Sequence, residues 1–305
     1  MNIEFKILDF FDKLRNTFLD NLNYYISFIL GSIGLILIFL LIYWIFDKDK
    51  GLIIGYSLIS SSLINNFIKG LVARKRPFEH SGHEYLKKLP NESDGATGSS
   101  FPSGHSQNSV ALYTTTILQY PGRRTIWLKI IAITFATLVC FSRLYLGVHF
   151  PSDVFAGALL GVGIAFFMTF IQDSLGEKKW LLYIITSVLF LPCLFFKKVD
   201  NSFLFGRDFI KTYGLLIGFT IGAILEEKTI NFGCSHISFL QKLIRVIIGL
   251  IIVGGLYLIY GVVPSHIHNN TIFTIVMHIL ISFSGIYLVP LIFTSIENIK
   301  NKKRI

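Results

Sequence analysis

The feature that most constrains this chain is a series of apolar runs, each long enough to cross a lipid bilayer. A hydrocarbon core about 30 Å thick is crossed by about 20 residues in helical conformation. Nine such runs occur, at about residues 25–46, 51–68, 104–119, 125–146, 152–171, 180–196, 209–225, 240–262 and 271–296. Because a backbone inside a bilayer must satisfy its hydrogen bonds internally, these runs predict helices. The expected fold class is therefore all-α: a polytopic membrane helix bundle with about nine transmembrane helices.

The composition and charge agree with a membrane protein. Hydrophobic residues make up 52% of the chain and charged residues only 15%, whereas soluble domains carry about 25% charged residues. The net charge of +10 comes mainly from the gaps between apolar runs and from the C-terminal tail, where basic side chains contact anionic lipid. We therefore expect the lipid bilayer as a partner, and no nucleic acid. The three cysteines are widely spaced and indicate neither a disulfide framework nor a zinc site.

The order of polar and apolar segments predicts three parts. Residues 1–24 place Phe5, Leu8, Phe11, Leu14 and Phe18 at roughly helical spacing between charges, which predicts an amphipathic segment lying on the membrane interface. Residues 25–175 form a membrane core that contains all the chemical motifs described below. Residues 176–305 form an added C-terminal transmembrane bundle. The small residues between 157 and 165 favour close packing of the fifth run against a neighbouring helix.

The distribution of basic loops predicts an orientation in the cell membrane. With nine spans, the gaps at 47–50, 120–126, 172–179 and 226–239 share one face with the basic tail, and the positive-inside rule makes that face cytoplasmic. The loop at 71–102 and the segment 143–153 then lie on the extracytoplasmic face. His266 and His268 fall on that same face.

A first group of charged residues leaves the second apolar run, in Lys69-Gly-Leu-Val-Ala-Arg-Lys-Arg76-Pro77. Two cations a few turns apart can point at one site, although a basic helix end that reaches to the headgroups is the alternative. A second group, Pro102-Ser103-Gly104-His105, opens the third run. Proline and serine favour helix starts, and the free N–H groups of a helix N-terminus attract anions.

The third group is the segment from Ser142-Arg143 through His149 to Asp153. His149 and Asp153 are four residues apart, so in a helix they share a face and can form a hydrogen bond. A carboxylate on one imidazole nitrogen leaves the other nitrogen free and more basic, as a histidine nucleophile or base requires. The alternative is that Asp153 caps the fifth helix.

Together the three groups carry the patterns K-x6-RP, PSGH and SR-x5-H-x3-D, in order and with the right internal spacing. The chain thereby resembles the type 2 phosphatidic acid phosphatase superfamily over about residues 50–170. The resemblance implies that His149 is the nucleophile that takes the phosphoryl group and that Asp153 orients it. It implies that His105 protonates the leaving oxygen and then activates water.

The same resemblance implies a phosphate clamp, made by the side chains of Lys69, Arg76 and Arg143 with the hydroxyl of Ser103 and the N–H of Gly104. Guanidinium groups match phosphate oxygens bidentately. Three cations and a helix N-terminus can neutralise the charge that a metal ion neutralises in other phosphoryl-transfer sites. We therefore expect neither a metal ion nor another cofactor.

The leading hypothesis for function is a metal-independent integral membrane phosphatase that acts on a lipid phosphate or lipid diphosphate through a phosphohistidine. Undecaprenyl diphosphate, phosphatidic acid and phosphatidylglycerol phosphate are the candidate membrane lipid substrates. A second hypothesis is a phosphatase for a soluble sugar phosphate such as glucose 6-phosphate, because the nine-span plan and His149-Phe150-Pro151 are similar to the glucose-6-phosphatases. Phosphotransfer to another acceptor is a third, and a non-enzymatic transporter or scaffold is a fourth.

Overall fold

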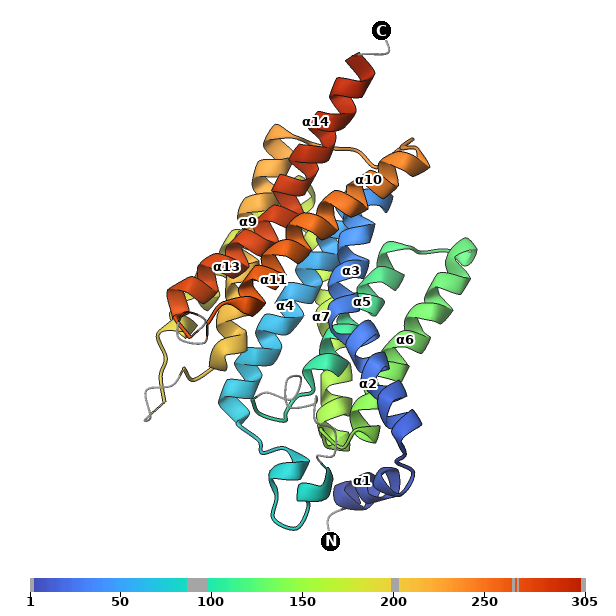
Figure 1. Ribbon diagram of the computed structural model, residues 1–305, viewed down its shortest axis with the longest axis vertical. Coiled ribbons are helices and arrows are strands. Elements are labelled where there is room, and N and C mark those ends of the chain that lie inside the picture. The colour runs from blue at the N-terminus through green and yellow to red at the C-terminus, as the bar shows by residue number, and fades with distance from the viewer. Residues whose placement is uncertain (1–2, 87–97, 199–202, 265–266, 268, 303–305) are drawn as a thin grey trace. The chain divides into compact units, whose positions relative to one another are not determined.

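The computed structural model describes residues 3–86, 98–198, 203–264, 267 and 269–302. His266, His268 and residues 87–97 of the predicted polar loop lie outside this set. The longer helices are α1 (Ile3–Lys13), α2 (Thr17–Gly31), α3 (Ile33–Leu41), α4 (Lys48–Val72), α5 (Gly104–Gln119), α6 (Ile126–Tyr145), α7 (Pro151–Leu175), α8 (Lys179–Phe190), α9 (Gly206–Thr229), α10 (Phe239–Gly249), α11 (Gly255–Val262), α13 (Thr271–Phe283) and α14 (Val289–Lys302). The predicted all-α membrane fold is confirmed (Figure 1).

Within the described residues, seven helical segments are long and apolar enough to cross a membrane. The prediction of nine differs at two places. Only the three-residue 3-10 turn Gly176–Lys178, with Gly176 at a φ of +52°, separates α7 from α8, so residues 151–194 make up one of the seven segments although the chain turns between the two helices. Helix α5 has only 16 residues and is rich in serine, threonine and amide side chains, which lowers its hydropathy. The chain is thus a multi-pass membrane protein, and the count of nine stays a prediction.

The backbone divides into two compact units. The first contains residues 1–37, 60–170 and 197–206, and the second contains residues 38–59, 171–196 and 207–305. The division therefore cuts through α4 and α7, and it assigns residues 38–59 to the same unit as the C-terminal helices. The boundaries at residues 24 and 175, which the sequence analysis places between the three parts of the chain, stay a prediction.

Polar side chains in α4 find their partners on α5, within the first unit. The Asn65 amide donates to Gln107 Oε1 at 2.9 Å, and the Gln107 amide donates to the Ser61 carbonyl at 2.9 Å. Ser61 Oγ donates to Asn108 at 2.8 Å. Buried amides are costly in an apolar medium unless they are paired. These bonds therefore fix α5, whose first residues carry two of the sequence motifs, against α4.

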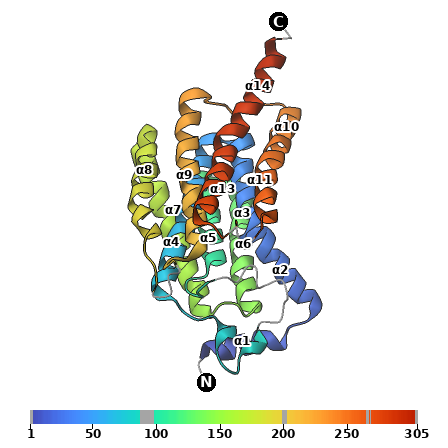
Figure 2. The same ribbon diagram turned by 60° about the vertical axis from the view of Figure 1, so that its left-hand side comes forward.

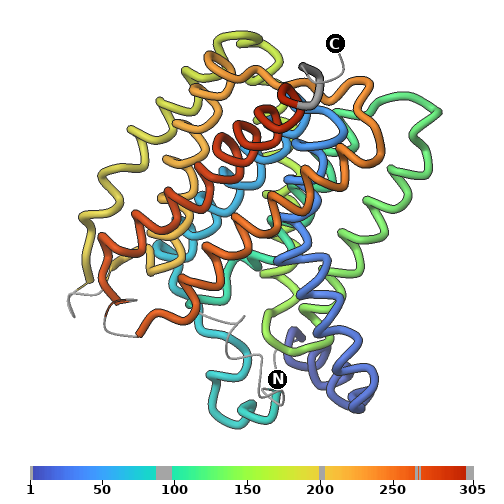
Figure 3. Tube along the Cα trace, turned by 45° about the horizontal axis from the view of Figure 1, so that its top comes forward, coloured from blue at the N-terminus to red at the C-terminus, as the bar shows by residue number. Residues whose placement is uncertain are grey.

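Two glycines of α7 allow that helix to approach the backbone of α5. A Cβ atom on Gly157 would lie 2.7 Å from the Ser103 carbonyl, and one on Gly161 would lie 2.5 Å from the Gln107 carbonyl. This confirms the close packing predicted from the small residues of the fifth run. On another side, α6 packs along α2 and α5, and the traces of α2 and α6 run side by side in Figure 3.

The predicted interfacial segment consists of α1 and the first turns of α2. Helix α1 ends at Lys13, and the side chain of Asn16 caps α2 by accepting a hydrogen bond from the Leu19 N–H at 3.0 Å. One face of α1 buries Leu8 in a cluster with Leu86 and Phe150. The opposite face exposes the apolar side chains of Ile3, Ile7, Phe10 and Leu14. Apolar side chains thus lie on both faces of this segment, and its placement on the membrane interface stays a prediction.

Within the second unit, hydrogen bonds to one π-helical turn join segments far apart in the sequence. The flanking helices α13 and α14 are labelled in Figure 2. Tyr43 Oη donates to the Ile286 carbonyl at 2.8 Å, and Trp44 Nε1 donates to the Gly285 carbonyl at 2.9 Å. Both acceptors belong to the π-helical turn Ser284–Leu288. Buried Arg245 forms two 2.9 Å hydrogen bonds with the Glu297 carboxylate. These contacts satisfy polar groups that the membrane interior would leave unpaired.

A pair of glycine substitutions tests the α5–α7 contact. We expect Gly161→Ala to lower the free energy of unfolding by about 1–3 kcal/mol, because the new methyl group meets the backbone of α5. Gly163→Ala is the matched control, since a Cβ there has no atom within 4 Å and alanine favours helix. Thermal unfolding in detergent gives the unfolding midpoint of each variant. Equal unfolding midpoints for the two variants would contradict the contact.

Candidate active site

The predicted site residues all belong to the first compact unit and come from five segments. Lys69 lies in the last turn of α4, and Arg76 caps the short 3-10 turn Pro77–Glu79. Ser103, Gly104 and His105 form the start of α5. Arg143 lies in the last turn of α6. His149 precedes α7, and Asp153 lies in its first turn.

His149 and Asp153 are brought together, but not by a shared helix. Helix α7 begins at Pro151, so His149 lies in the loop before it. His149 Nδ1 is 3.7 Å from Asp153 Oδ2, which is an ion-pair distance and longer than a hydrogen bond. Ser100 lies between them: its hydroxyl donates to Asp153 Oδ2 and is 3.4 Å from His149 Nδ1. Asp153 also accepts a bond from the Phe150 N–H at 2.8 Å, so it caps the start of α7, while its contact with His149 has an ion-pair distance in place of the expected hydrogen bond.

Arg76 faces the other nitrogen of the His149 ring. Its Nη1 atom is 3.3 Å from His149 Nε2 and donates to the Val148 carbonyl at 3.0 Å. Its Nε atom donates to the Gly98 carbonyl at 3.0 Å. The side chain is only 2% exposed. These bonds fix the guanidinium beside the nitrogen that would meet a phosphoryl group.

Lys69 and the start of α5 lie next to each other. Lys69 Nζ donates to the Ser99 carbonyl at 2.6 Å, and Ser99 Oγ donates to the Lys69 carbonyl at 2.8 Å. A Cβ on Gly104 would lie 3.0 Å from Asn65 Oδ1 and 3.9 Å from Lys69 Cε. The glycine therefore leaves room for α4 beside the first N–H groups of α5. The backbone N–H of Ser103 donates to the Asp153 carbonyl at 3.0 Å, which ties this turn to α7.

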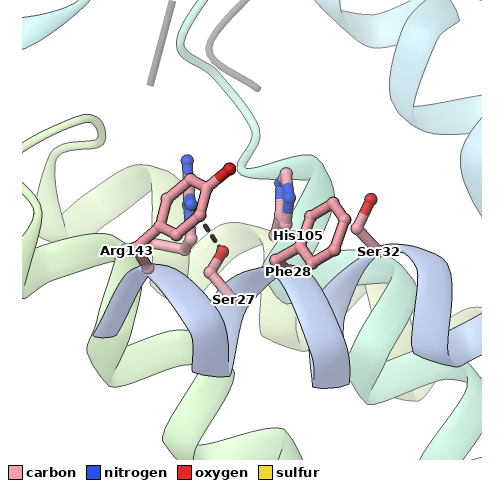
Figure 4. A pocket seen from close by; sticks show the side chains of 6 residues that line it. Ser27, Phe28, Ser32, His105 and Arg143 are labelled. Carbon is pink, nitrogen blue, oxygen red and sulfur yellow. Dashed lines mark hydrogen bonds between the residues drawn. The ribbon is translucent and has the colours of Figure 1, made fainter. Parts of the chain in front are cut away.

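His105 and Arg143 line a small pocket of about 50 Å³ together with Tyr24, Ser27, Phe28 and Ser32. Figure 4 shows Ser27 and Phe28 of α2 facing His105 and Arg143. Arg143 Nη1 donates to Ser27 Oγ at 2.6 Å, and both side chains are buried. The pocket therefore has a basic and imidazole wall opposite a wall with aromatic side chains.

The electrostatics of this site favour an anion next to a neutral imidazole. Burial lowers the pKa of His149 well below its usual value of 6.5, and the cations of Arg76, Lys69 and Arg143 lower it further. His149 is therefore neutral at physiological pH, and the cations around it attract phosphate. Among the described residues, no three or more His, Cys, Asp and Glu side chains form a group able to hold a metal ion.

Four residues at this site were not expected from the sequence: Glu4, Ser27, Arg74 and Ser100. Ser100 borders the PSGH pattern, and Arg74 occupies a variable position of K-x6-RP, so neither carries a motif signal. Glu4 and Ser27 lie far before the motifs. Arg74 Nη1 donates to Asp153 Oδ1 at 2.7 Å, and its Nη2 donates to Glu4 Oε2 at 2.8 Å. Only the folded chain brings Arg74 and Ser100 to Asp153, Glu4 to Arg74, and Ser27 to Arg143.

Comparison with known proteins confirms the resemblance seen in the motifs. Residues 50–176 match the PAP2 superfamily. Residues 210–302 match the transmembrane extension of PAP2 superfamily phosphatases. The chain belongs to the PAP2 superfamily. All the predicted site residues lie inside the first matched segment, whereas α1 and α2 lie before it.

Curated relatives are phosphatases. The chain is 34% identical over 137 residues to an undecaprenyl-diphosphatase of Sulfolobus acidocaldarius, over 44% of this chain and 62% of that protein. It is 28% identical over 171 residues to a lipid A 4'-phosphatase of Bacteroides thetaiotaomicron, over 52% of this chain and 72% of the relative. It is 31% identical over 120 residues to the glucose-6-phosphatase catalytic subunit 1 of Canis lupus familiaris, over 34% of this chain and 32% of that protein.

The surroundings of His149 predict its titration. In protein labelled with ¹³C at histidine Cε1, we expect the His149 signal to keep the chemical shift of a neutral ring at pH values below 6.5. Arg76→Gln removes a neighbouring cation and therefore raises the pKa of His149. The exposed neighbour Lys75→Gln serves as the control, and His149→Asn assigns the signal. A pKa at or above 6.5, or one that falls in Arg76→Gln, would contradict this description.

Proposed function

We propose that this protein is an integral membrane phosphatase that hydrolyses a lipid phosphate or lipid diphosphate through a phosphohistidine on His149, without a metal ion. The observation that carries the proposal is the His149 ring, buried in a membrane protein between the Asp153 carboxylate and the Arg76 guanidinium. A neutral imidazole held between an anion and a cation can attack phosphorus at the cation-facing nitrogen and keep its proton at the other.

The reaction has two displacements on phosphorus. In the first, the lone pair of His149 Nε2 forms a bond to phosphorus, while the bond from phosphorus to the leaving oxygen breaks and His105 donates a proton to that oxygen. In the second, His105 takes a proton from water, the water oxygen bonds to phosphorus, and the phosphorus–nitrogen bond breaks. The first step releases the lipid alcohol from a monophosphate, or the lipid monophosphate from a diphosphate. The second step releases inorganic phosphate. Asp153 stabilises the cationic ring while the phosphoryl group is attached.

The clamp residues stabilise the charge on the phosphoryl oxygens during both steps. Lys69, Arg76 and Arg143 supply fixed positive charge, and Ser103 and Gly104 add a hydroxyl and an N–H at the start of α5. Phosphoryl transfer depends on such positioning and charge neutralisation. Because these cations are already held by neighbouring carbonyls and hydroxyls, little reorganisation accompanies the reaction.

Two observations support a lipid as the leaving group. The pocket beside His105 has Tyr24 and Phe28 of α2 on its wall, and α2 is part of an apolar segment able to cross a bilayer. Two of the relatives are named as phosphatases of lipids, undecaprenyl diphosphate and lipid A.

The basic gaps between spans favour the cytoplasm. We therefore propose that the active site lies on the extracytoplasmic face of the cell membrane.

A soluble sugar phosphate is the second candidate, supported by the glucose-6-phosphatase relative. The His149-Phe150-Pro151 segment is present in this chain, but Pro151 begins α7 and Phe150 packs against Leu8 of α1 in the structure. Competition by glucose 6-phosphate in a lipid assay separates this candidate from the first.

Phosphate release from a substrate panel tests the proposal. The panel contains undecaprenyl diphosphate, phosphatidic acid, phosphatidylglycerol phosphate and glucose 6-phosphate, in detergent with excess EDTA. We expect release from at least one lipid, none in His149→Asn, and full activity in His236→Asn, whose side chain is exposed. In His105→Asn we expect a loss of about 10²- to 10⁴-fold, the usual contribution of a general acid–base.

Trapping of the intermediate completes this test. With ³²P-labelled substrate, acid-labile label on the protein should be present in the wild type and absent in His149→Asn. Activity that disappears in EDTA and returns with Mg²⁺ would overturn the metal-independent mechanism. Release that persists in His149→Asn would overturn the role of that residue.

A further inference from the structure

We propose that Arg74 is a positioning residue for the His149–Asp153 pair and that Glu4 of α1 balances its charge, so that the N-terminal helix contributes to the chemistry of the site. The proposal rests on the proposed function, because it concerns how the same histidine is prepared. Arg74 and Glu4 have no role in the mechanism described above.

Arg74 makes the closest charged contact of the Asp153 carboxylate. Its Nη1 atom is 2.7 Å from Asp153 Oδ1, whereas His149 Nδ1 is 3.7 Å from Oδ2. Asp153 is fully buried, and a buried carboxylate is costly unless a cation and hydrogen bonds accompany it. Its Oδ2 atom is occupied by the Phe150 N–H and the Ser100 hydroxyl. Arg74 therefore sets both the direction of this carboxylate and the negative charge that His149 experiences.

The guanidinium of Arg74 is itself fixed on three sides. It donates to Ser152 Oγ at 2.7 Å and to Glu4 Oε2 at 2.8 Å. Its centre lies 4.1 Å above the ring of Phe150, the residue next to His149. A planar guanidinium fits this combination of ion pairs and ring stacking, and an ammonium group does not. The position therefore requires arginine for its geometry and a cation for its charge.

Glu4 anchors the group from α1. Its Oε1 atom accepts hydrogen bonds from the Ser152 N–H at 3.1 Å and the Ser152 hydroxyl at 2.6 Å. Burial acts to raise the pKa of Glu4, but the bonds from Ser152 and Arg74 outweigh it and hold the pKa below its usual value. Glu4 is therefore ionised at neutral pH. The packing of Phe5 and Leu8 against Phe150 and Leu86 keeps α1 in place.

The groups that contact one another from Glu4 to His149 alternate in charge. Glu4 is negative, Arg74 positive and Asp153 negative, and His149 follows. From the other elements the ring faces the positive side chains of Arg76, Lys69 and Arg143, and the imidazole of His105 on α5 is electrostatically close. A change at Arg74 or Glu4 therefore alters the field of Asp153 without touching the phosphate clamp.

This arrangement predicts opposite changes from two neutralising substitutions, measured as the pH dependence of kcat/KM on the substrate of the wild type. In Arg74→Gln the charge of Asp153 is no longer offset, so the protonated form of His149 is favoured. The acid limb of the kcat/KM–pH profile, where activity falls as His149 is protonated, then moves to higher pH. In Glu4→Gln the net field becomes more positive and the acid limb moves to lower pH. We expect shifts on the order of 0.5 pH unit in each direction.

Three further variants make the test specific. Arg74→Lys keeps the positive charge but loses the planar guanidinium with its several N–H donors. We therefore expect an unshifted acid limb with a lower kcat and an unchanged KM. Lys75→Gln removes an exposed cation one residue away, and it should change neither the acid limb nor kcat. His149→Asn is assayed in parallel: activity there would overturn the proposed function itself.

The outcomes separate a positioning role from a merely structural one. A structural role lowers the amount of active enzyme and the unfolding midpoint, and it leaves the acid limb in place. Unshifted acid limbs in both Arg74→Gln and Glu4→Gln, with His149→Asn inactive, would overturn the role of Arg74 alone. Shifts in the same direction would overturn it too. If Arg74→Gln fails to fold, the shift in Glu4→Gln and the kcat of Arg74→Lys decide the question.

Discussion

The burial of the Asp153 carboxylate is the constraint on which the active-site geometry depends. A carboxylate with no exposure to solvent must be surrounded by donors, and the donors here come from three separate segments. The Phe150 N–H, the Ser100 hydroxyl and the Arg74 guanidinium all bond to it. The main chain of the same residue accepts the Ser103 N–H. One residue thus joins the first turn of α7, the loop before α5 and the end of the first motif.

This arrangement places a neutral histidine among cations. Arg76, Lys69 and Arg143 lower the affinity of His149 for a proton, and in the proposed function the same cations attract the phosphate. The two effects have one cause, because positive charge disfavours imidazolium and favours an anion. Close contacts with carbonyl and hydroxyl oxygens compensate the cations in the absence of substrate.

The N-terminal helices extend the site beyond the segment shared with the superfamily. Helix α2 contributes Ser27, which holds Arg143, and the aromatic side chains of the pocket beside His105. Helix α1 contributes Glu4, which holds Arg74. Both helices precede the matched segment at residues 50–176.

The sequence by itself determined the membrane class, the helical fold and the identity of the motif residues. Apolar length fixes the first two, because a bilayer core permits only internally bonded backbone, and the third follows from spacing within short segments. The sequence did not reveal the break between α1 and α2, where Asn16 caps a new helix. It also joined His149 to Asp153 through a helix that in fact begins two residues after the histidine.

Only the tertiary structure decided which groups complete the site. Ser100 and Arg74 occupy positions without a motif signal, and Glu4 and Ser27 lie on helices remote from the motifs in sequence. Each meets its partner through burial and hydrogen-bond satisfaction across contacts of up to 148 residues in separation, as for Glu4 and Ser152. Local patterns record periodicity and spacing, whereas the pairing of a buried charge depends on every element packed around it. The motif residues were therefore legible in the chain, and the residues that contact them in the folded protein were not.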